Sequence, residues 1–276
     1  MNLMTRLATY GALLTLVFAA AAFAGSRVDP RPGETVPEGD GMHGMDEAAA
    51  PVRGLAVSDG GLTLVPERTT APRGRAFPLR FAIHGEDGAI VRDFDVEHTK
   101  RMHLIVVRRD MTGFQHLHPT QQPDGAWSTD VRLPDAGAYR VFADFSVDGK
   151  VHTLATDLTV DGAARNAALP APDPTADVDG MRVTLTEGAS RAGQESELSF
   201  SVTRDGAPVA VEPYLGARGH LVALREGDLA FLHVHPDADR LRFGATFPSA
   251  GRYRLFLQFQ VDGQVHTAAF TQEVGR

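Results

Sequence analysis

Two histidine-rich pentapeptides are the segments of this chain of 276 residues whose side chains could most readily bind a ligand or perform chemistry. They are QHLHP at residues 115–119 and LHVHP at residues 232–236. Neutral imidazole binds zinc, copper, nickel and iron. Two histidines separated by one residue on a β-strand point to the same side of the strand. Each pentapeptide therefore offers two metal ligands on one face, provided that the segment is extended.

The two pentapeptides belong to a long internal repeat. Residues 103–119 (HLIVVRRDMTGFQHLHP) align without a gap with residues 220–236 (HLVALREGDLAFLHVHP), and residues 134–155 align with residues 248–269. A repeat of about 115 residues predicts two like domains rather than a solenoid of short units. Eight of the eleven histidines fall into matched pairs: His103 with His220, His116 with His233, His118 with His235, and His152 with His266.

Both repeats have the pattern of all-β domains. Short runs such as FPLRFAI (77–83) and YRVFADF (139–145) mix apolar and polar residues at a period of two, and Asp-Gly pairs separate the runs. About seven strands per repeat predict two tandem immunoglobulin-like or fibronectin-like β-sandwich domains. Tyr139 in AGAY and Tyr253 in AGRY fit the tyrosine corner of this fold.

The chain begins with an apolar segment. Residues 1–24 combine Arg6, an uncharged and mostly apolar stretch, and the small-residue end Ala22-Phe23-Ala24. These features predict a secretory signal peptide or, if it is not cleaved, a membrane anchor. The protein is therefore expected to be secreted or held in the cell envelope, outside the cytoplasm, with membrane contact only through this segment.

Composition divides the remainder of the chain into four segments. Residues 25–53, rich in Pro, Gly and charge, predict a flexible linker. Residues 54–162 and 178–276 are the two β-sandwich repeats, and residues 163–177 are an Ala/Pro linker. The first linker contains GMHGM (41–45), which is either a cluster of soft-metal ligands or a chance combination.

Charge and composition exclude several classes of function. The net charge of −8 argues against nucleic acid as a partner, because phosphate binding needs a basic face. The chain has no cysteine, so disulfides, thiolate zinc sites and blue-copper centres are excluded. It also has no nucleophile elbow, phosphate loop or dinucleotide fingerprint.

The expected fold places the histidines at one end of each sandwich. His103 begins strand C, the next strand ends at His118, and strand G carries His152 after the Asp148-Gly149 turn. In the second repeat, a two-residue turn at Glu226-Gly227 would set His220 opposite His233 across a hairpin.

These placements predict one metal site per repeat, with Phe114 and Phe231 supplying an apolar wall. The predicted ligands are His103, His116, His118 and His152 in the first repeat, and His220, His233, His235 and His266 in the second. A purely structural role, in which the histidines bind loop carbonyls, is the alternative. Asp144 on strand F is a candidate carboxylate beside the first site, but its counterpart is Gln258, so the two sites need not be equivalent.

Three motifs, KRMHLIVVRRDMTGFQHLHP, AGAYRVFADF and GHLVALREGDLAFLHVHP, resemble a group of secreted, mainly actinobacterial proteins with immunoglobulin-like repeats. That group is described as uncharacterised, YtkA-like or heavy-metal-binding. The resemblance covers roughly residues 54–276. It implies an extracytoplasmic protein of immunoglobulin-like repeats and no settled activity.

The leading functional hypothesis is an extracytoplasmic metal-binding protein that acts in metal transport, buffering or resistance. Copper is the first choice and zinc the second, and an envelope protein is a further possible partner. The first alternative is a metal-dependent enzyme with a zinc-like or cupin-like site of three histidines, although Gln122 and Asp239 stand where a cupin would have Glu. The second is a metal-free surface interaction module. Binding is favoured over catalysis, and no catalytic residue is assigned.

Overall fold

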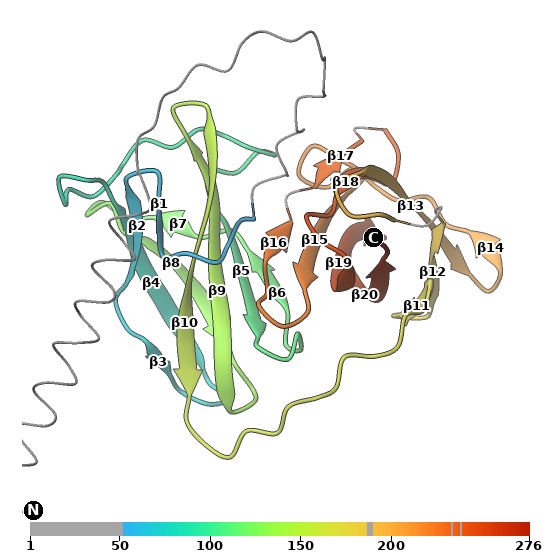
Figure 1. Cartoon of the computed structure of the whole chain (residues 1–276), viewed down its shortest axis with the longest axis horizontal. Helices are drawn as coiled ribbons and strands as arrows, with labels where there is room; N and C mark the ends of the chain where they lie inside the picture. Colours follow the sequence, from blue (N-terminus) through green and yellow to red (C-terminus); the bar gives the residue numbers. More distant parts are fainter. Residues whose placement is uncertain (1–51, 187–189, 233, 238) are drawn as a thin grey trace, which may run out of the picture. The chain divides into compact units, whose positions relative to one another are not determined.

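The first repeat consists of two β-sheets packed face to face (Figure 1). The computed structural model describes residues 52–186, 190–232, 234–237 and 239–276. One sheet has the order β1-β2-β4-β8-β7 and the other β3-β10-β9-β5-β6. All pairs are antiparallel except that of β3 with β10. The strands are β1 (Ser58–Asp59), β2 (Leu62–Pro66), β3 (Thr70–Ala71), β4 (Ala76–His84), β5 (His103–Arg108), β6 (Gln115–Leu117), β7 (Thr120–Gln121), β8 (Trp127–Arg132), β9 (Gly137–Val147) and β10 (Lys150–Val160).

The second repeat has the same plan. One sheet has the order β11-β12-β13-β18-β17, with β14 paired to β13, and the other has the order β16-β15-β19-β20. The strands are β11 (Thr175–Val178), β12 (Met181–Thr186), β13 (Glu195–Arg204), β14 (Ala207–Pro208), β15 (Gly219–Arg225), β16 (Phe231–Leu232), β17 (His235–Pro236), β18 (Arg242–Thr246), β19 (Gly251–Val261) and β20 (Gln264–Val274). Strand β11 begins inside the segment predicted as the Ala/Pro linker.

Both repeats are immunoglobulin-like sandwiches, which confirms the fold predicted from the sequence. In each, the long strand that begins at the Gly of the Ala-Gly pair lies between the strand that carries His103 or His220 and the last strand of the repeat. The tyrosine corners are present: the Tyr139 hydroxyl donates to the carbonyl oxygen of Asp135 at 3.0 Å, and the Tyr253 hydroxyl donates to that of Ser249 at 2.9 Å. Among the described residues, no helix is long and apolar enough to span a membrane.

Each repeat has its own core between its two sheets, built by the period-two alternation of strand side chains. In the first repeat, the largest buried residues include Leu79, Trp127 and Tyr139. In the second, Phe243 and Tyr253 occupy the corresponding space. The linked repeats lie within one compact unit, residues 48–276.

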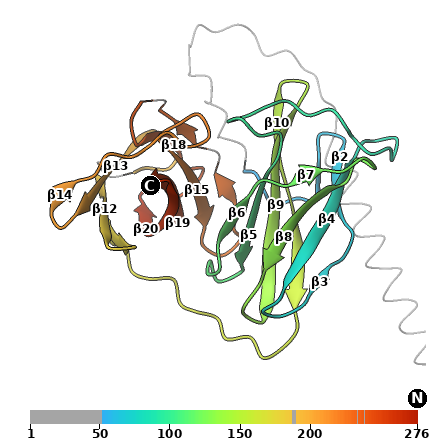
Figure 2. The ribbon, with the colours of Figure 1, turned by 180° about the vertical axis from the view of Figure 1, so that it is seen from behind.

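Strands β5 and β15 are buried on both faces, which ordinary sandwich packing does not explain. Every residue of β5 is buried, and so is every residue of β15 except Arg225. The outward residues of the two strands form a third apolar cluster, in which Ile105 and Val107 of the first repeat join Val222 and Leu224 of the second. The strands β5 and β15 are therefore packed against each other's sheet, as the ribbons show from both sides (Figure 1, Figure 2).

The contact between the repeats has approximate twofold symmetry. Phe114 stacks on Phe256, with ring centroids 4.1 Å apart and ring planes at 6°. The exchanged pair, Phe231 and Phe142, is also in contact, at 5.5 Å. Phe114 aligns with Phe231, and Phe142 aligns with Phe256, so each repeat presents the same surface to the other. This arrangement is that of an isologous dimer interface within one chain.

The segment before β1 is built into this contact. The Phe231 amide donates to the Arg53 carbonyl at 2.9 Å, and the Gly54 amide donates to the Thr153 carbonyl at 3.1 Å. Gly54 has a φ of 70°, and a Cβ at this position would lie 2.8 Å from both Phe142 and Phe231. Glycine is therefore required here by backbone conformation and by the lack of space.

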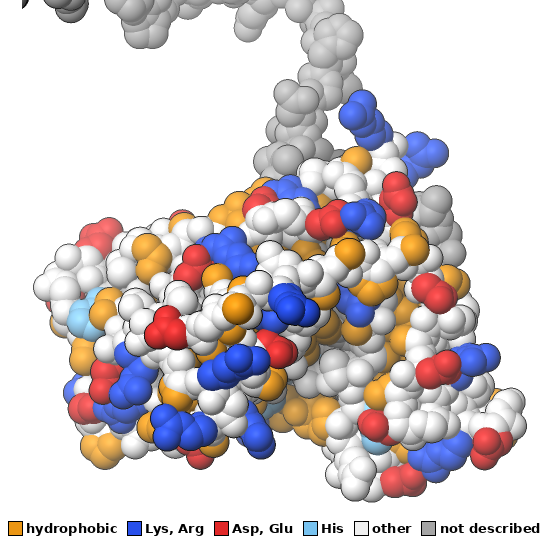
Figure 3. All heavy atoms as spheres, turned by 90° about the horizontal axis from the view of Figure 1, so that it is seen from below, with side chains coloured by type: hydrophobic (Ala, Val, Ile, Leu, Met, Phe, Trp, Pro, Cys, Tyr) orange, Lys and Arg blue, Asp and Glu red, His pale blue; other side chains and the backbone are white. Residues whose placement is uncertain are grey.

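The exposed surface carries mixed charge. Acidic and basic side chains are interspersed over the face in Figure 3, with hydrophobic side chains between them. Arg80 illustrates the pattern, since it forms ion pairs with both Glu67 and Asp124. Exposed pairs of this kind each stabilise a fold by no more than about 1 kcal/mol.

The interface predicts a measurable energetic coupling between the repeats. Phe256→Ala should lower the free energy of unfolding by about 3–5 kcal/mol, because the side chain is buried. In a double-mutant cycle with Phe114→Ala, the coupling energy should be about 0.5–1.5 kcal/mol, as for a stacked aromatic pair. Urea denaturation of the four proteins measures it.

The matched control replaces Phe256 by Phe247, which is buried in the core of the second repeat against Tyr253. The cycle of Phe114 with Phe247 should give a coupling near zero. Equal couplings in the two cycles would mean that the repeats do not dock through this surface.

Candidate metal centre

Three histidines of the first repeat lie on one face of the hairpin formed by β5 and β6. His103 is the first residue of β5, His116 is in the middle of β6, and His118 follows the last residue of β6. Ile105 pairs with His116 and Leu104 with Leu117, so the register places all three imidazoles on the outer face of the sheet. One ring nitrogen from each histidine lies within 4.8 Å of the others.

The spacing of the three imidazole rings fits ligation of one shared metal ion. The ring centroids are 5.3 Å apart for His103 and His116, 5.0 Å for His103 and His118, and 4.9 Å for His116 and His118. Imidazoles bound to zinc have metal–nitrogen distances of roughly 2.0–2.1 Å, which puts their ring centres ~5.2 Å apart in a tetrahedral site. The three rings therefore already have the separations of a tetrahedral centre.

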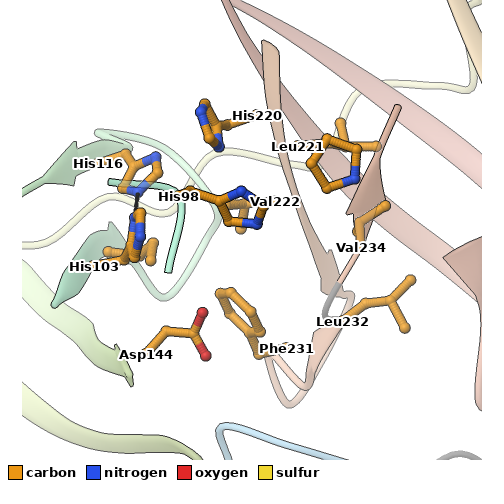
Figure 4. Close-up of a pocket in the computed structure, with 12 residues that line it drawn as sticks. His98, His103, His116, Asp144, His220, Leu221, Val222, Phe231, Leu232 and Val234 are labelled. Atoms are coloured by element: carbon orange, nitrogen blue, oxygen red, sulfur yellow. Dashed lines mark hydrogen bonds between the residues drawn. The ribbon is translucent and has the colours of Figure 1, made fainter. Parts of the chain in front are cut away.

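With the Gln258 amide oxygen facing His116, hydrogen bonds determine which nitrogens of two of these rings remain free to bind. His103 Nε2 donates to the Glu97 carbonyl at 3.1 Å, which leaves the Nδ1 lone pair available. His116 Nδ1 donates to Gln258 Oε1 at 2.8 Å, which leaves Nε2 available. These two nitrogens face each other at 3.1 Å (Figure 4).

His118 lacks a hydrogen bond on one nitrogen. Its Nε2 is buried and has no hydrogen-bond partner among the described residues. Burial and the neighbouring His103 lower the pKa of His118 to about 4. Burial also lowers the pKa of His103, and it holds the pKa of His116 well below its ordinary value. All three side chains are therefore neutral near pH 7, which is the ligand form.

The second repeat contributes His220 to the same place. The His220 ring centroid lies 6.4 Å from that of His103 and 6.2 Å from that of His116. His220 Nε2 donates to the Tyr214 carbonyl at 3.0 Å. Burial lowers the pKa of His220 to about 4, although the bond to Tyr214 opposes the shift.

A cavity of about 50 Å³ separates the histidines of the two repeats. His98, His103, His116 and His220 point toward one another across it (Figure 4). Its apolar side includes Phe231, as the sequence suggested for a dry wall.

Asp144 on β9 and its counterpart Gln258 on β19 have different contacts. Asp144 pairs with His103 in the sheet, lines the cavity and accepts a hydrogen bond from the Thr153 hydroxyl at 2.6 Å. Gln258 pairs with His220 but holds His116 of the other repeat. The first-repeat histidines are thus positioned partly by the second repeat.

His152 and His266 lie on the other face of their sheets, so they do not join the cluster as expected. His103 pairs with Asp144, and Asp144 pairs with Thr153, which leaves His152 opposite Phe145 on the inner face. A shift of one residue along a strand reverses the direction of the side chain. His152 packs on the Phe145 ring with its Nδ1 lacking a partner among the described residues.

His266 shows the same displacement in the second repeat. It pairs with Phe259, whereas His220 pairs with Gln258, so the two histidines point to opposite faces. His266 Nδ1 interacts with an Asp179 carboxylate oxygen at 2.7 Å. This contact ties the imidazole to a loop of its own repeat.

The remaining predicted ligands cannot be placed. His233 and the GMHGM stretch lie outside the described residues, as do residues 1–51 with the predicted signal or anchor, and the side chain of His235 is not described. The predicted pairing of His220 with His233 is wrong, because Ala223 pairs with Leu232 and shifts the register by two residues. The Arg225 amide bonds to the Ala230 carbonyl, so the turn is longer than two residues.

Two residues close to the three-histidine cluster, His98 and Gln258, were not identified from the sequence. His98 has no matched partner in the repeat and lies in a turn, with a φ of 47°, so nothing in its spacing pointed to the site. Gln258 was noted only as the counterpart of Asp144. The sequence did contain one sign that the outer face of this strand is covered. The run HLIVV (103–107) is largely apolar, which is typical of a strand buried on both faces.

The chain belongs to the family described as a domain of unknown function, DUF8832. The family matches residues 56–162 and again residues 176–276, so both repeats are copies of one family domain. No curated protein matches the chain. The comparisons give no support for a relationship to YtkA-like or heavy-metal-binding proteins, and that part of the resemblance stays a prediction.

Several solved structures are similar at low identity. The adhesin FdeC of Escherichia coli is 14% identical, with 80% of this chain and 66% of that chain covered and a TM-score of 0.28. Salmonella alpha-2-macroglobulin is 14% identical, with coverages of 84% and 16% and a TM-score of 0.28. The Yersinia pseudotuberculosis adhesin InvE is 12% identical, with coverages of 80% and 61% and a TM-score of 0.24. The chain spans 66% or less of these structures, and scores this low carry no argument about function.

The lowered pKa values predict that the metal-free protein loses stability in mild acid. Above pH 6.5, His118 and His220 are neutral in both the folded and the unfolded chain, so their contribution is complete. Between pH 6.5 and about 4 the unfolded chain binds protons that the folded chain does not, so the free energy of unfolding falls with pH. Urea denaturation with a chelator, at pH 8 and pH 5, measures the loss. His118→Gln with His220→Gln should reduce this loss, and an unchanged slope would assign it to other groups.

Proposed function

We propose that the protein binds one transition-metal ion through His103, His116 and His118. The observation that carries the proposal is the arrangement of ring nitrogens: His103 Nδ1 and His116 Nε2 lie 3.1 Å apart, and the buried Nε2 of the adjacent His118 has no partner among the described residues. Two nitrogens that ligate one tetrahedral ion are ~3.3 Å apart, given metal–nitrogen distances of roughly 2.0–2.1 Å. A cation between them would satisfy all three groups.

The hydrogen bonds around the rings support this proposal. Histidine ligands of metals usually donate their second N–H to a carbonyl or carboxylate, which fixes the ring and raises its basicity. His103 donates in this way to Glu97, and His116 donates to Gln258. The supporting contacts of a metal site are therefore present for two of the three ligands.

A network without a metal is also conceivable. If the Gln258 amide were turned, its NH₂ group would donate to His116 Nδ1, and His116 Nε2 would then donate to His103 Nδ1. That network satisfies these two rings but leaves His118 Nε2 with no partner in the part of the chain that the structure describes. An unsatisfied buried nitrogen costs about 1–3 kcal/mol, which favours the metal.

The donor set indicates which ions to test. Three neutral imidazoles without a thiolate suit zinc and copper, and Cu²⁺ has the highest affinity of the first-row divalent ions for nitrogen sites. We infer a role in extracytoplasmic metal transport, buffering or resistance, with copper first and zinc second. The predicted signal or anchor segment is the basis for the extracytoplasmic location.

His118→Ala tests whether His118 binds the metal or only supports the fold. His118 Nε2 has no hydrogen-bond partner among the described residues, so the variant should change the metal-free free energy of unfolding by no more than about 1 kcal/mol. It should lower metal affinity by at least about 100-fold, more than the 10–100-fold cost of losing a supporting residue. Untagged protein is titrated calorimetrically with zinc and, separately, copper.

The control is His84→Ala, since His84 is held by the Gly88 carbonyl and lies outside the cluster. It should bind metal like the parent. At a metal concentration 100 times the dissociation constant, the parent and control should gain about 2.7 kcal/mol of stability. If the parent binds neither ion, or if His118→Ala binds like the parent, the proposal fails and the metal-free interaction module becomes the better explanation.

A further inference from the structure

We infer that His220 of the second repeat is the fourth ligand of this ion, so that the chain holds one metal centre shared between its repeats. The inference rests on the proposed function and deepens it, because it adds a ligand that the three-histidine cluster lacks. It also replaces the sequence-based expectation of two independent sites. Its physical consequence is that the ion links the two repeats.

An ion bound by the three histidines would have a fourth coordination position, and the side on which that position lies supports this assignment. Zinc and copper sites with three histidines keep a fourth position for another ligand. His103 and His116 line the inter-repeat cavity, and across that cavity lies His220. Leu221 and Val222 line the cavity beside His220, and His98 is the other imidazole on that side. The fourth position therefore faces a buried imidazole.

His220 has the same hydrogen-bonding arrangement as His103. The two residues occupy equivalent positions, and each donates its Nε2 proton to the carbonyl six residues earlier, Glu97 or Tyr214. The shared tautomer leaves Nδ1 of both rings with its lone pair. Only 8% of His220 is exposed, so water offers its free nitrogen little competition.

The distance from His220 to the cluster is short enough for ligation after a small movement. Its centroid lies 6.2 Å and 6.4 Å from those of His116 and His103, compared with ~5.2 Å for two imidazoles on one tetrahedral ion. An inward shift of about 1 Å closes the difference, and a rotation of the side chain with a small adjustment at the interface supplies such a shift.

His98 is the competing candidate for the fourth position. Its ring centroid lies 5.4 Å from that of His220 and 6.3 Å from that of His103, so it is near the cluster. It lies in a turn, however, and no hydrogen bond to its ring is found among the described residues to fix a tautomer. His220 is anchored and is close to two of the three ligands, so the structure favours it.

The second repeat already reaches this centre through a neighbouring residue. His220 and Gln258 form a pair across β15 and β19, and Gln258 accepts the His116 Nδ1 proton. One pair of adjacent residues would thus provide both a ligand and the support for another ligand. Metal binding should consequently strengthen the contact between the repeats, including the stack of Phe114 on Phe256.

The test compares the full chain with H220Q, H98Q and H84Q. Gln at position 220 keeps a donor for the Tyr214 carbonyl but has no imidazole lone pair. Zinc titration should give one ion per chain for the parent and an affinity at least 10-fold lower for H220Q. H98Q and H84Q should match the parent. Cobalt(II) is the spectroscopic probe, because its visible absorption changes when a four-coordinate site loses a protein nitrogen.

X-ray absorption of the zinc-loaded parent gives a second measurement that needs no variant. Four imidazoles at the ion support the inference, and three imidazoles overturn it. Amide hydrogen exchange at β15 and β19 should slow on zinc binding in the parent and not in H220Q.

The outcomes distinguish this inference from the proposed function. If His118→Ala abolishes binding while H220Q keeps the parent's affinity and cobalt spectrum, the three-histidine site stands and the shared centre is wrong. Two zinc ions per chain in independent sites, or an effect of H98Q in place of H220Q, also overturns the shared centre. If the parent binds no metal, both proposals fall.

Discussion

The packing of the outer face of β5 against the outer face of β15 is the constraint on which the rest of the molecule depends. A sandwich normally leaves the outer faces of its sheets to solvent, and here both central strands have apolar residues on both sides. Ile105 and Val222 belong to the apolar cluster between the repeats, and His103 and His220 precede them by two residues on the same outer faces of β5 and β15. The interface that joins the repeats therefore also determines which histidines can meet.

Much of the fold could be read from the sequence, because it depends on local rules. The repeat, the strand runs and the tyrosine corners at Tyr139 and Tyr253 follow from periodicity and turn chemistry. The common face of His103, His116 and His118 follows from a hairpin register that can shift by two residues without reversing a side chain. His152 was assigned to the wrong face because its position depends on counting residues across two strand pairs, where an error of one residue reverses the result.

The contact between the repeats could not be derived in the same way. Two like domains suggest two like sites, and nothing in the spacing of His220 shows that it faces His103 of the other repeat. Duplicated surfaces can pack on each other with twofold symmetry, and such packing pairs a position of one copy with a second position of the other copy, and the second with the first. The pairs of Phe114 with Phe256 and of Phe231 with Phe142 are the signs of that symmetry, and they become visible only in three dimensions.

The presence of imidazoles at this interface has to be explained by something other than stability. Isoleucine, valine and phenylalanine occupy neighbouring positions of the same interface, and apolar residues of suitable size would pack at the histidine positions as well. Instead, His220 is buried and His116 is half-buried, desolvation lowers the pKa values of both, and a nitrogen of His118 has no partner among the described residues. The unpaired nitrogen of His118 opposes folding in the metal-free chain, because burying an unpaired polar atom costs about 1–3 kcal/mol. A bound cation reverses the sign of this contribution, since it pairs the free nitrogens that face the interface. Under the proposal of a shared metal centre, the same residues would strengthen the contact when an ion is bound, and the docking of the repeats would be coupled to metal supply.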